Sequence, residues 1–216
     1  MKKKKVAIIG ANGFLGLSIS KALYKKGYDV YGLVRKKVSL SNPEYKKLKI
    51  KTLIIGDLEK VQHIKFQTNK FDYVINLAAR AHISSKMSIN PDVAIDKFTN
   101  IERNLVKNFN KKKVKLIQLS SAKTKLIKNS KLLSNNELVY IKAKLKSEKI
   151  IEENFNKYII LRPPLIYGPN VRANFLTLMK VINLRVPLPF LDLKNIRSYL
   201  YVENLAALIL TIIDKN

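Results

Sequence analysis

Three glycines follow a short apolar run near the amino terminus, in the stretch VAIIGANGFLGLSISKAL. They are Gly10, Gly13 and Gly16, three of the seven glycines in the chain. Glycine loses more backbone freedom on folding than any other residue, so it is costly inside regular structure. Its concentration between an apolar run and a helical pattern therefore indicates a turn to which something approaches closely.

Strand-like and helical patterns alternate along the chain. Residues 6–10 predict a buried strand, and residues 15–26 predict a helix that ends at Gly27. Further apolar runs predict strands at 29–35, 51–57, 71–79, 114–121 and 158–164. These runs are nearly continuous rather than alternating, which is typical of strands covered by helices on both faces. The expected fold class is therefore α/β, a doubly wound parallel sheet with helices on both faces.

The predicted strand–turn–helix junction could bind a phosphate group. The amino terminus of a helix presents unpaired N–H groups and a partial positive charge. Gly10 would let the chain turn off the strand, Gly13 would leave room for a pyrophosphate, and Gly16 would let the helix pack on the sheet. The spacing is G-x-x-G-x-x-G rather than G-x-G-x-x-G, so tight helix–sheet packing without a ligand is the alternative.

The residues after the other strands become candidates because ligands of open α/β sheets bind at the carboxyl ends of the strands. Arg35 suits a 2′-phosphate, which favours NADPH over NADH, although it could equally be a surface cation. Asp57 could accept a hydrogen bond from an adenine amino group or cap a helix. Leu77, Ala78 and Ala79 would allow a ribose to approach closely.

A tyrosine and a lysine four residues apart open a helical pattern at 140–155. Tyr140 and Lys144 share one helix face, and the ammonium is expected to lower the pKa of the phenol so that it can act as acid or base. Ser121, at the end of the fifth strand, could bind the same substrate oxygen. Since the chain holds ten tyrosines, the Y-x-x-x-K pattern alone would indicate only helix surface. Residues 123–136 are rich in Lys, Asn and Ser and predict a loop over the sheet edge.

The motifs occur in a characteristic order. GANGFLG, GDL, NLAA, the serine pair before Ala122, YIKAK, LRPPLIYGP and RSYLYVEN follow one another as in extended short-chain dehydrogenase/reductases, the NAD-dependent epimerase/dehydratase family, which the chain resembles over nearly its whole length. The resemblance is strongest to bacterial reductases and epimerases of the UDP-glucose 4-epimerase type that act on UDP-linked N-acetylated sugars for surface polysaccharide. It implies a Rossmann-like NAD(P)-binding domain at 1–164 and a partial substrate-binding region at 165–216.

The resemblance also implies roles for individual residues. The catalytic set would be Ser121, Tyr140 and Lys144, with hydride passing between a sugar carbon and the nicotinamide. Substrate would be bound by Ser121, Asn174 and Arg197, the arginine on the diphosphate. The cofactor would contact Gly10, Asn12, Gly13, Phe14, Leu15, Gly16, Arg35, Asp57, Leu58, Leu77, Ala78, Ala79, Tyr140, Lys144, Pro163 and Ile166.

Three departures from the family pattern leave an alternative open. Family members generally continue past the position of Asn216, residues 122–136 lack the usual Val-Tyr-Gly segment, and Ile141 replaces a glycine. The alternative is a truncated, non-catalytic Rossmann protein that binds nucleotide or nucleic acid. A 4,6-dehydratase is disfavoured because Ser121 and the two residues after it lack the acidic pair of those enzymes.

Composition disfavours or excludes several other classes of protein. Lys and Arg total 42 against 15 Asp and Glu, a formal net charge of +27, but the lysines are spread along the chain, which disfavours a nucleic-acid partner. The absence of cysteine and the presence of only two histidines exclude thiolate chemistry and a Cys- or His-rich metal site. No signal peptide or membrane span is predicted, so we expect a cytoplasmic protein. The family resemblance implies a homodimer.

Overall fold

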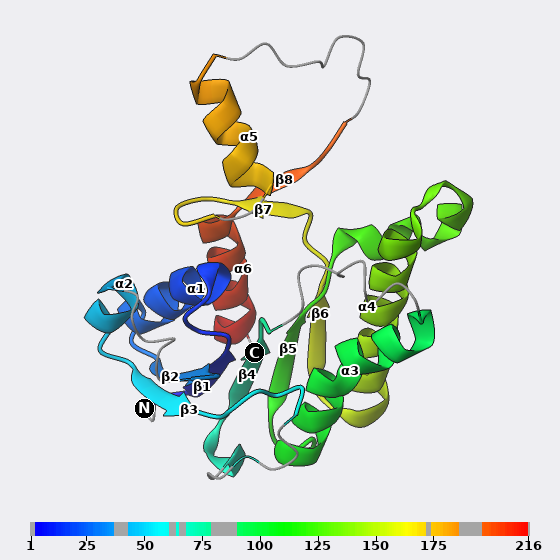
Figure 1. Cartoon of the computed structure of the whole chain (residues 1–216). Coiled ribbons are helices and arrows are strands. Elements are labelled where there is room, and N and C mark those ends of the chain that lie inside the picture. The colour runs from blue at the N-terminus through cyan, green and yellow to red at the C-terminus, as the bar shows by residue number, and fades with distance from the viewer. Residues whose placement is uncertain are drawn as a thin grey trace.

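A parallel six-stranded sheet forms the centre of the molecule (Figure 1). The computed structural model describes residues 3–36, 43–60, 64, 68–78, 90–171, 174–185 and 196–215. The strand order is β3-β2-β1-β4-β5-β6, and every neighbouring pair is parallel. The strands are β1 (Lys5–Ile9), β2 (Asp29–Val34), β3 (Lys51–Ile54), β4 (Tyr73–Asn76), β5 (Lys115–Leu119) and β6 (Tyr158–Leu161). This order confirms the predicted doubly wound α/β fold.

Helices connect the strands and cover both faces of the sheet (Figure 1). The α-helices are α1 (Phe14–Lys25), α2 (Pro43–Lys47), α3 (Pro91–Asn108), α4 (Asn135–Asn154), α5 (Asn174–Asn183) and α6 (Val202–Asp214). The 3₁₀ segments are η2 (Thr68–Lys70) and η4 (Ala122–Leu132). No helix in the described part of the chain is long and apolar enough to span a bilayer.

Alternate residues of the strands belong to two separate hydrophobic cores, as expected when helices lie on both faces of the sheet. Val6 and Ile8 of β1 pack with α1 and α6, whereas Ala7 and Ile9 pack with α3 and α4. All four are at most 2% exposed. The apolar run at the start of the chain is thus explained by burial on both sides.

The segment after β5 is helical, which corrects the predicted loop at 123–136. The Ser121 side chain accepts a hydrogen bond from the Lys123 N–H and begins η4, whose backbone is interrupted at Asn129. Helix α4 then begins at Asn135, before the predicted position, because Ser134 and Glu137 form a reciprocal capping box. The polar composition of residues 123–136 predicted a loop, but short 3₁₀ turns and helix caps are also built from polar residues.

A small unit lies beyond the carboxyl edge of the main sheet (Figure 1). Strands β7 (Leu165–Tyr167) and β8 (Tyr199–Tyr201) form a parallel pair, and α5 packs on them through the rings of Tyr167, Phe175 and Tyr199. Helix α6 leaves β8 and returns to the main core. The domain boundary at 164/165 remains a prediction.

Candidate active site

The glycine-rich turn leaves the carboxyl end of β1 beside β4, where the strand order reverses. Gly10 has φ +79°, a conformation that L side chains rarely adopt. Its N–H donates to the Leu33 carbonyl of β2 at 3.0 Å, and its own carbonyl accepts from the Gly13 N–H at 3.0 Å. A Cβ at Gly10 would lie 3.6 Å from the backbone nitrogen of Ala78, after β4. The turn is therefore at the crevice where doubly wound sheets bind ligands.

Gly16 and Gly13 are under different constraints. A Cβ on Gly16 would lie 2.2 Å from the Gly10 carbonyl oxygen and 2.6 Å from backbone atoms of Ala11, so only glycine fits. A Cβ on Gly13 would meet the same carbonyl oxygen at 3.2 Å, and Gly13 is exposed. Gly16 thus serves helix packing, while Gly13 keeps the surface of the turn clear.

The turn fits the pyrophosphate of a dinucleotide. The N–H groups of residues 14–16, in the first turn of α1, precede the first bond of the helix, from the Leu17 N–H to the Gly13 carbonyl, and this turn carries no acidic side chain. Gly13 occupies the N-cap with an extended backbone and adds no side chain there. Asn12, Phe14 and Leu15 are each partly buried around this terminus. Backbone donors, a helix dipole and clearance for a ligand therefore coincide.

Two of the predicted cofactor residues contact each other after β2 and β3. Arg35 Nη1 lies 3.8 Å from Asp57 Oδ2, with the arginine side chain 64% exposed. The Asp57 carboxylate also accepts from the Glu59 N–H at 3.2 Å, so it caps the following turn. Leu58 is buried, and its carbonyl accepts a 2.6 Å bond from Asn104. The arginine is thus a surface cation with a carboxylate beside it.

Residues after β4 line the other side of the crevice. Leu77 and Ala78 are partly buried, and the Leu77 N–H donates to the Ile9 carbonyl at 3.2 Å. The Ala78 N–H is held by Asn76 Oδ1 at 3.1 Å. Ala79 lies outside the described residues, as do both histidines.

Ser121 and Tyr140 meet at the carboxyl end of β5, although they belong to different elements. The Ser121 side chain acts on the Tyr140 phenol and favours its ionised form. Burial nevertheless raises the pKa of Tyr140 above its usual value, and Ser121 only partly opposes the rise. The expected lowering of this pKa by a nearby ammonium is therefore wrong for the protein alone, because the low-dielectric surroundings outweigh the effect of the serine.

Lys144 lies one turn after Tyr140 and is buried. It is 7% exposed, and its Nζ donates a 3.5 Å hydrogen bond to the Leu119 carbonyl at the end of β5. Burial lowers the pKa of the ammonium, while the carboxylates of Glu102 and Glu148 oppose the shift. The lysine is thus fixed at the strand terminus that also precedes Ser121.

The remaining predicted residues lie further along the chain. Pro163 is partly buried after β6, and its carbonyl accepts from the Ala122 N–H at 2.9 Å. Ile166 of β7 packs against the core on the α1 side. Asn174 begins α5, and Arg197 is exposed just before β8. Two of the three proposed substrate residues, Asn174 and Arg197, thus belong to the small unit beyond the sheet.

A buried polar chain behind the site was not recognised from the sequence. Asn76 of β4 donates to Gln118 of β5 at 2.9 Å, and Gln118 donates to Glu102 of α3 at 3.0 Å. All three side chains are at most 2% exposed. The signal available was a polar residue inside each of two apolar runs, in YVIN and KLIQL.

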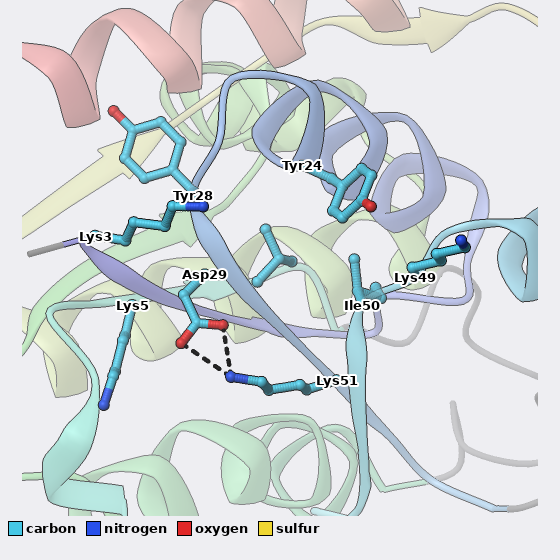
Figure 2. Close-up of a pocket in the computed structure, with 9 residues that line it drawn as sticks. Lys3, Lys5, Tyr24, Tyr28, Asp29, Lys49, Ile50 and Lys51 are labelled. Atoms are coloured by element: carbon cyan, nitrogen blue, oxygen red, sulfur yellow. Dashed lines mark hydrogen bonds and ion pairs between the residues drawn. The ribbon is translucent and has the colours of Figure 1, made fainter.

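The opposite edge of the sheet carries a separate hollow of about 480 Å³. Figure 2 shows four lysines around it, together with Tyr24 and Tyr28. One lysine is neutralised locally, because Lys51 Nζ lies 3.0 Å from Asp29 Oδ1. This hollow is at the amino-terminal ends of the strands and shares no residue with the candidate site at the carboxyl edge.

The fold and the crevice at the carboxyl edge are those of a doubly wound α/β protein. A sequence model described as the NAD dependent epimerase/dehydratase family matches residues 6–216, and the chain belongs to that family. The resemblance inferred from the motif order is therefore confirmed.

Individual relatives agree with this assignment. The chain is 26% identical to a UDP-glucose 4-epimerase of Vibrio cholerae over 98% of its own length and 67% of the relative's. Its fold matches UDP-glucose 4-epimerase from Bifidobacterium longum, solved with NAD⁺ and UDP, with a TM-score of 0.68, 19% identity and coverage of 98% and 74% of the two chains. The Thermotoga maritima UDP-glucose 4-epimerase, solved with UDP-glucose, gives 0.67 at 20% identity, with coverage of 96% and 72%.

Proposed function

We propose that this protein is an NAD(P)-dependent nucleotide-sugar oxidoreductase or epimerase that transfers hydride at a sugar carbon, C4, of a UDP-linked, N-acetylated sugar. The observation that carries the proposal is the meeting of Ser121, Tyr140 and Lys144 at the end of β5, two strands from the glycine-rich turn. The family membership and the relatives named for UDP-glucose 4-epimerase support the same chemistry.

The roles follow from the positions. The Tyr140 hydroxyl, on which Ser121 acts, would exchange a proton with the sugar oxygen that gains or loses charge. Lys144 would supply positive charge beside the phenol. The bound nicotinamide supplies the hydride chemistry, and the protein orients the sugar carbon toward it and excludes water. The turn at Gly10 and Gly13 would hold the pyrophosphate.

The raised pKa of Tyr140 has a functional consequence within this proposal. In the protein alone the phenol is protonated at neutral pH, so it is ready to donate rather than accept a proton. The positive charge on the ring of an oxidised nicotinamide, bound beside the phenol, would lower its pKa. The proposal therefore includes coupling between cofactor binding and proton transfer at Tyr140.

The cofactor preference belongs to the same proposal. Arg35 is exposed at the rim and would read a 2′-phosphate, which favours NADPH, while its Asp57 partner competes for the guanidinium. Asn174 and Arg197 would reach the UDP moiety, with the arginine on the diphosphate. The domain division at 164/165, the cytoplasmic location, a role in surface polysaccharide synthesis and a homodimeric state are parts of this proposal.

The experiment is turnover of Tyr140→Phe with UDP-N-acetylglucosamine and related UDP-sugars, followed by nicotinamide absorbance and product analysis. Loss of general acid–base catalysis should lower turnover by at least about 100-fold, with NADH and NADPH affinity nearly unchanged. Tyr24→Phe, on the exposed side of α1, is the matched control and should behave as the unmodified chain. Unchanged turnover of Tyr140→Phe would remove the proposed role.

A second candidate function is polyanion binding without catalysis. The specific observation in its favour is the hollow lined by Lys3, Lys5, Lys49 and Lys51 at the edge opposite the catalytic set (Figure 2). It predicts tight binding of a single-stranded oligonucleotide that weakens steeply with salt and with replacement of these lysines. Nicotinamide turnover together with weak oligonucleotide binding excludes it.

A further inference from the structure

A buried carboxylate on α4 is bound by an arginine just after β6. Glu148 is 3% exposed, and both of its carboxylate oxygens accept hydrogen bonds from Arg162, at 2.9 Å from Nε and 2.5 Å from Nη2. A bidentate pair of this kind fixes the distance between its two partners and also their relative rotation. Helix α4 and the end of β6 are therefore joined in one defined orientation.

The same side of the helix carries the proposed catalytic residues. Tyr140, Lys144 and Glu148 follow one another at intervals of four residues, so they lie along one face of α4. Lys144 Nζ donates to the carbonyl of the last β5 residue at 3.5 Å, and Ser121 acts on the Tyr140 phenol. Of these three attachments to the carboxyl edge of the sheet, only that of Glu148 joins opposite charges through two hydrogen bonds.

The arginine in turn belongs to the backbone that holds Ser121. The carbonyl of the residue before Arg162 accepts a hydrogen bond from the Ser120 N–H at 2.7 Å, and the carbonyl of the residue after it accepts from the Ala122 N–H at 2.9 Å. These two donors flank Ser121 in the chain. The ion pair therefore connects the helix that carries the tyrosine and the lysine to the segment that carries the serine.

We propose that Glu148 and Arg162 are positioning residues, whose two hydrogen bonds hold the Tyr140 face of α4 at its working distance from Ser121. The assignment rests on the proposed function for the roles of the residues that are positioned, whereas the ion pair itself is a property of the folded chain. Glu148 lies about 12 Å along the helix from Tyr140, so a rotation of α4 by about 5° at the pair would move the phenol by about 1 Å. A displacement of about 1 Å can cost about 100-fold in rate.

The test replaces both members of the pair in the double variant Glu148→Met, Arg162→Met. Apolar side chains of similar volume in place of a buried ion pair are often neutral for stability, so the variant should fold. Its kcat with the UDP-sugar should fall by at least about tenfold, while KM and the affinity for NADH stay nearly unchanged. An unchanged kcat, or a rise in KM alone, overturns the proposal. If the double variant does not fold, Arg162→Lys takes its place, since it keeps the charge and loses the fork of donors, and the same fall in kcat is expected.

The control is an ion pair on the exposed side of the same helix. Lys149 Nζ lies 3.6 Å from Glu153 Oε1, and both side chains are more than half exposed, so Lys149→Met should leave kcat unchanged.

A measurement without substrate separates this proposal from the proposed function. Residual dipolar couplings of the backbone N–H groups report the orientation of α4 relative to the main sheet. The couplings of residues 140–148 should change in the variant that lacks the bidentate pair, whereas those of α1 should stay as they are in the unmodified chain. Unchanged couplings in α4 overturn the proposal. Because the couplings need no turnover, they decide it even if the turnover test at Tyr140 fails.

Discussion

Replacing Gly16 by alanine tests how tightly the nucleotide turn is built. The new Cβ would lie 2.2 Å from the Gly10 carbonyl oxygen, whereas Cβ contacts essentially never fall below 3.0 Å. Because the neighbouring atoms belong to the backbone of the turn, that backbone has to move. Overpacking of this kind costs about 1–3 kcal/mol, and the better helix propensity of alanine returns up to about 1 kcal/mol. We expect a net loss of about 1–2 kcal/mol, a 5- to 30-fold fall in the ratio of folded to unfolded chain.

The matched variant is Gly13→Ala. Its Cβ would meet the same oxygen at 3.2 Å, and the backbone angles of φ −77° and ψ 173° suit alanine. Its free energy of unfolding should stay within about 0.5 kcal/mol of the unmodified value, because the losses and gains of alanine at an N-cap nearly cancel. Since Gly13 is exposed at the helix terminus, the variant should weaken NADH binding all the same.

The assay for both variants is urea unfolding followed by circular dichroism, combined with a fluorescence titration with NADH. Gly16→Ala should lose stability and binding, whereas Gly13→Ala should lose binding alone. A Gly16→Ala chain as stable as the unmodified one would refute the packing argument. A Gly13→Ala chain with full NADH affinity would contradict the placement of the ligand.

Three further outcomes are expected. Asn76→Ala should cost about 1–3 kcal/mol in urea unfolding, because Gln118 Oε1 loses its buried donor. Burial and the bond to Asp214 raise the pKa of Tyr28 from 10.0 to about 12, so between these pH values the folded chain binds more protons than the unfolded chain. The free energy of unfolding should therefore fall as the pH rises through that window, and it should fall less steeply in Tyr28→Phe. Arg35→Ala should abolish any preference for NADPH over NADH in a fluorescence titration, and an unchanged preference would exclude Arg35 as its source.

The sheet was predictable because its strands are buried on both faces. A near-continuous apolar run such as 6–10 has few other stable arrangements, and three glycines at its end identify the turn. The structure confirms all six strands and their common direction. Strand ends were less predictable: the sixth was expected to reach Pro164, but β6 ends at Leu161.

The surroundings of the site could not be read from the sequence in the same way. That Ser121 and Tyr140 act on one substrate oxygen was expected from their positions after the fifth strand and from the order of motifs, whereas the burial that raises the tyrosine pKa comes from tertiary packing. Glu102 occurs in a polar helical stretch, where an acidic residue normally faces solvent. Only the contact between α3 and α4 buries it. Its hydrogen-bond partner, Gln118, lies 16 residues further along the chain.

The central claim is that a nicotinamide dinucleotide binds at the carboxyl edge of the sheet. The most direct test is a titration of the ¹⁵N-labelled chain with NADH, followed through the assigned backbone N–H signals. The account predicts saturable shifts at Gly10, Gly13, Ala78 and Ser121, with little change at Lys49 and Lys51 beside the opposite hollow. Shifts confined to the lysine-lined edge, or no saturable shifts at the glycine-rich turn, would contradict it.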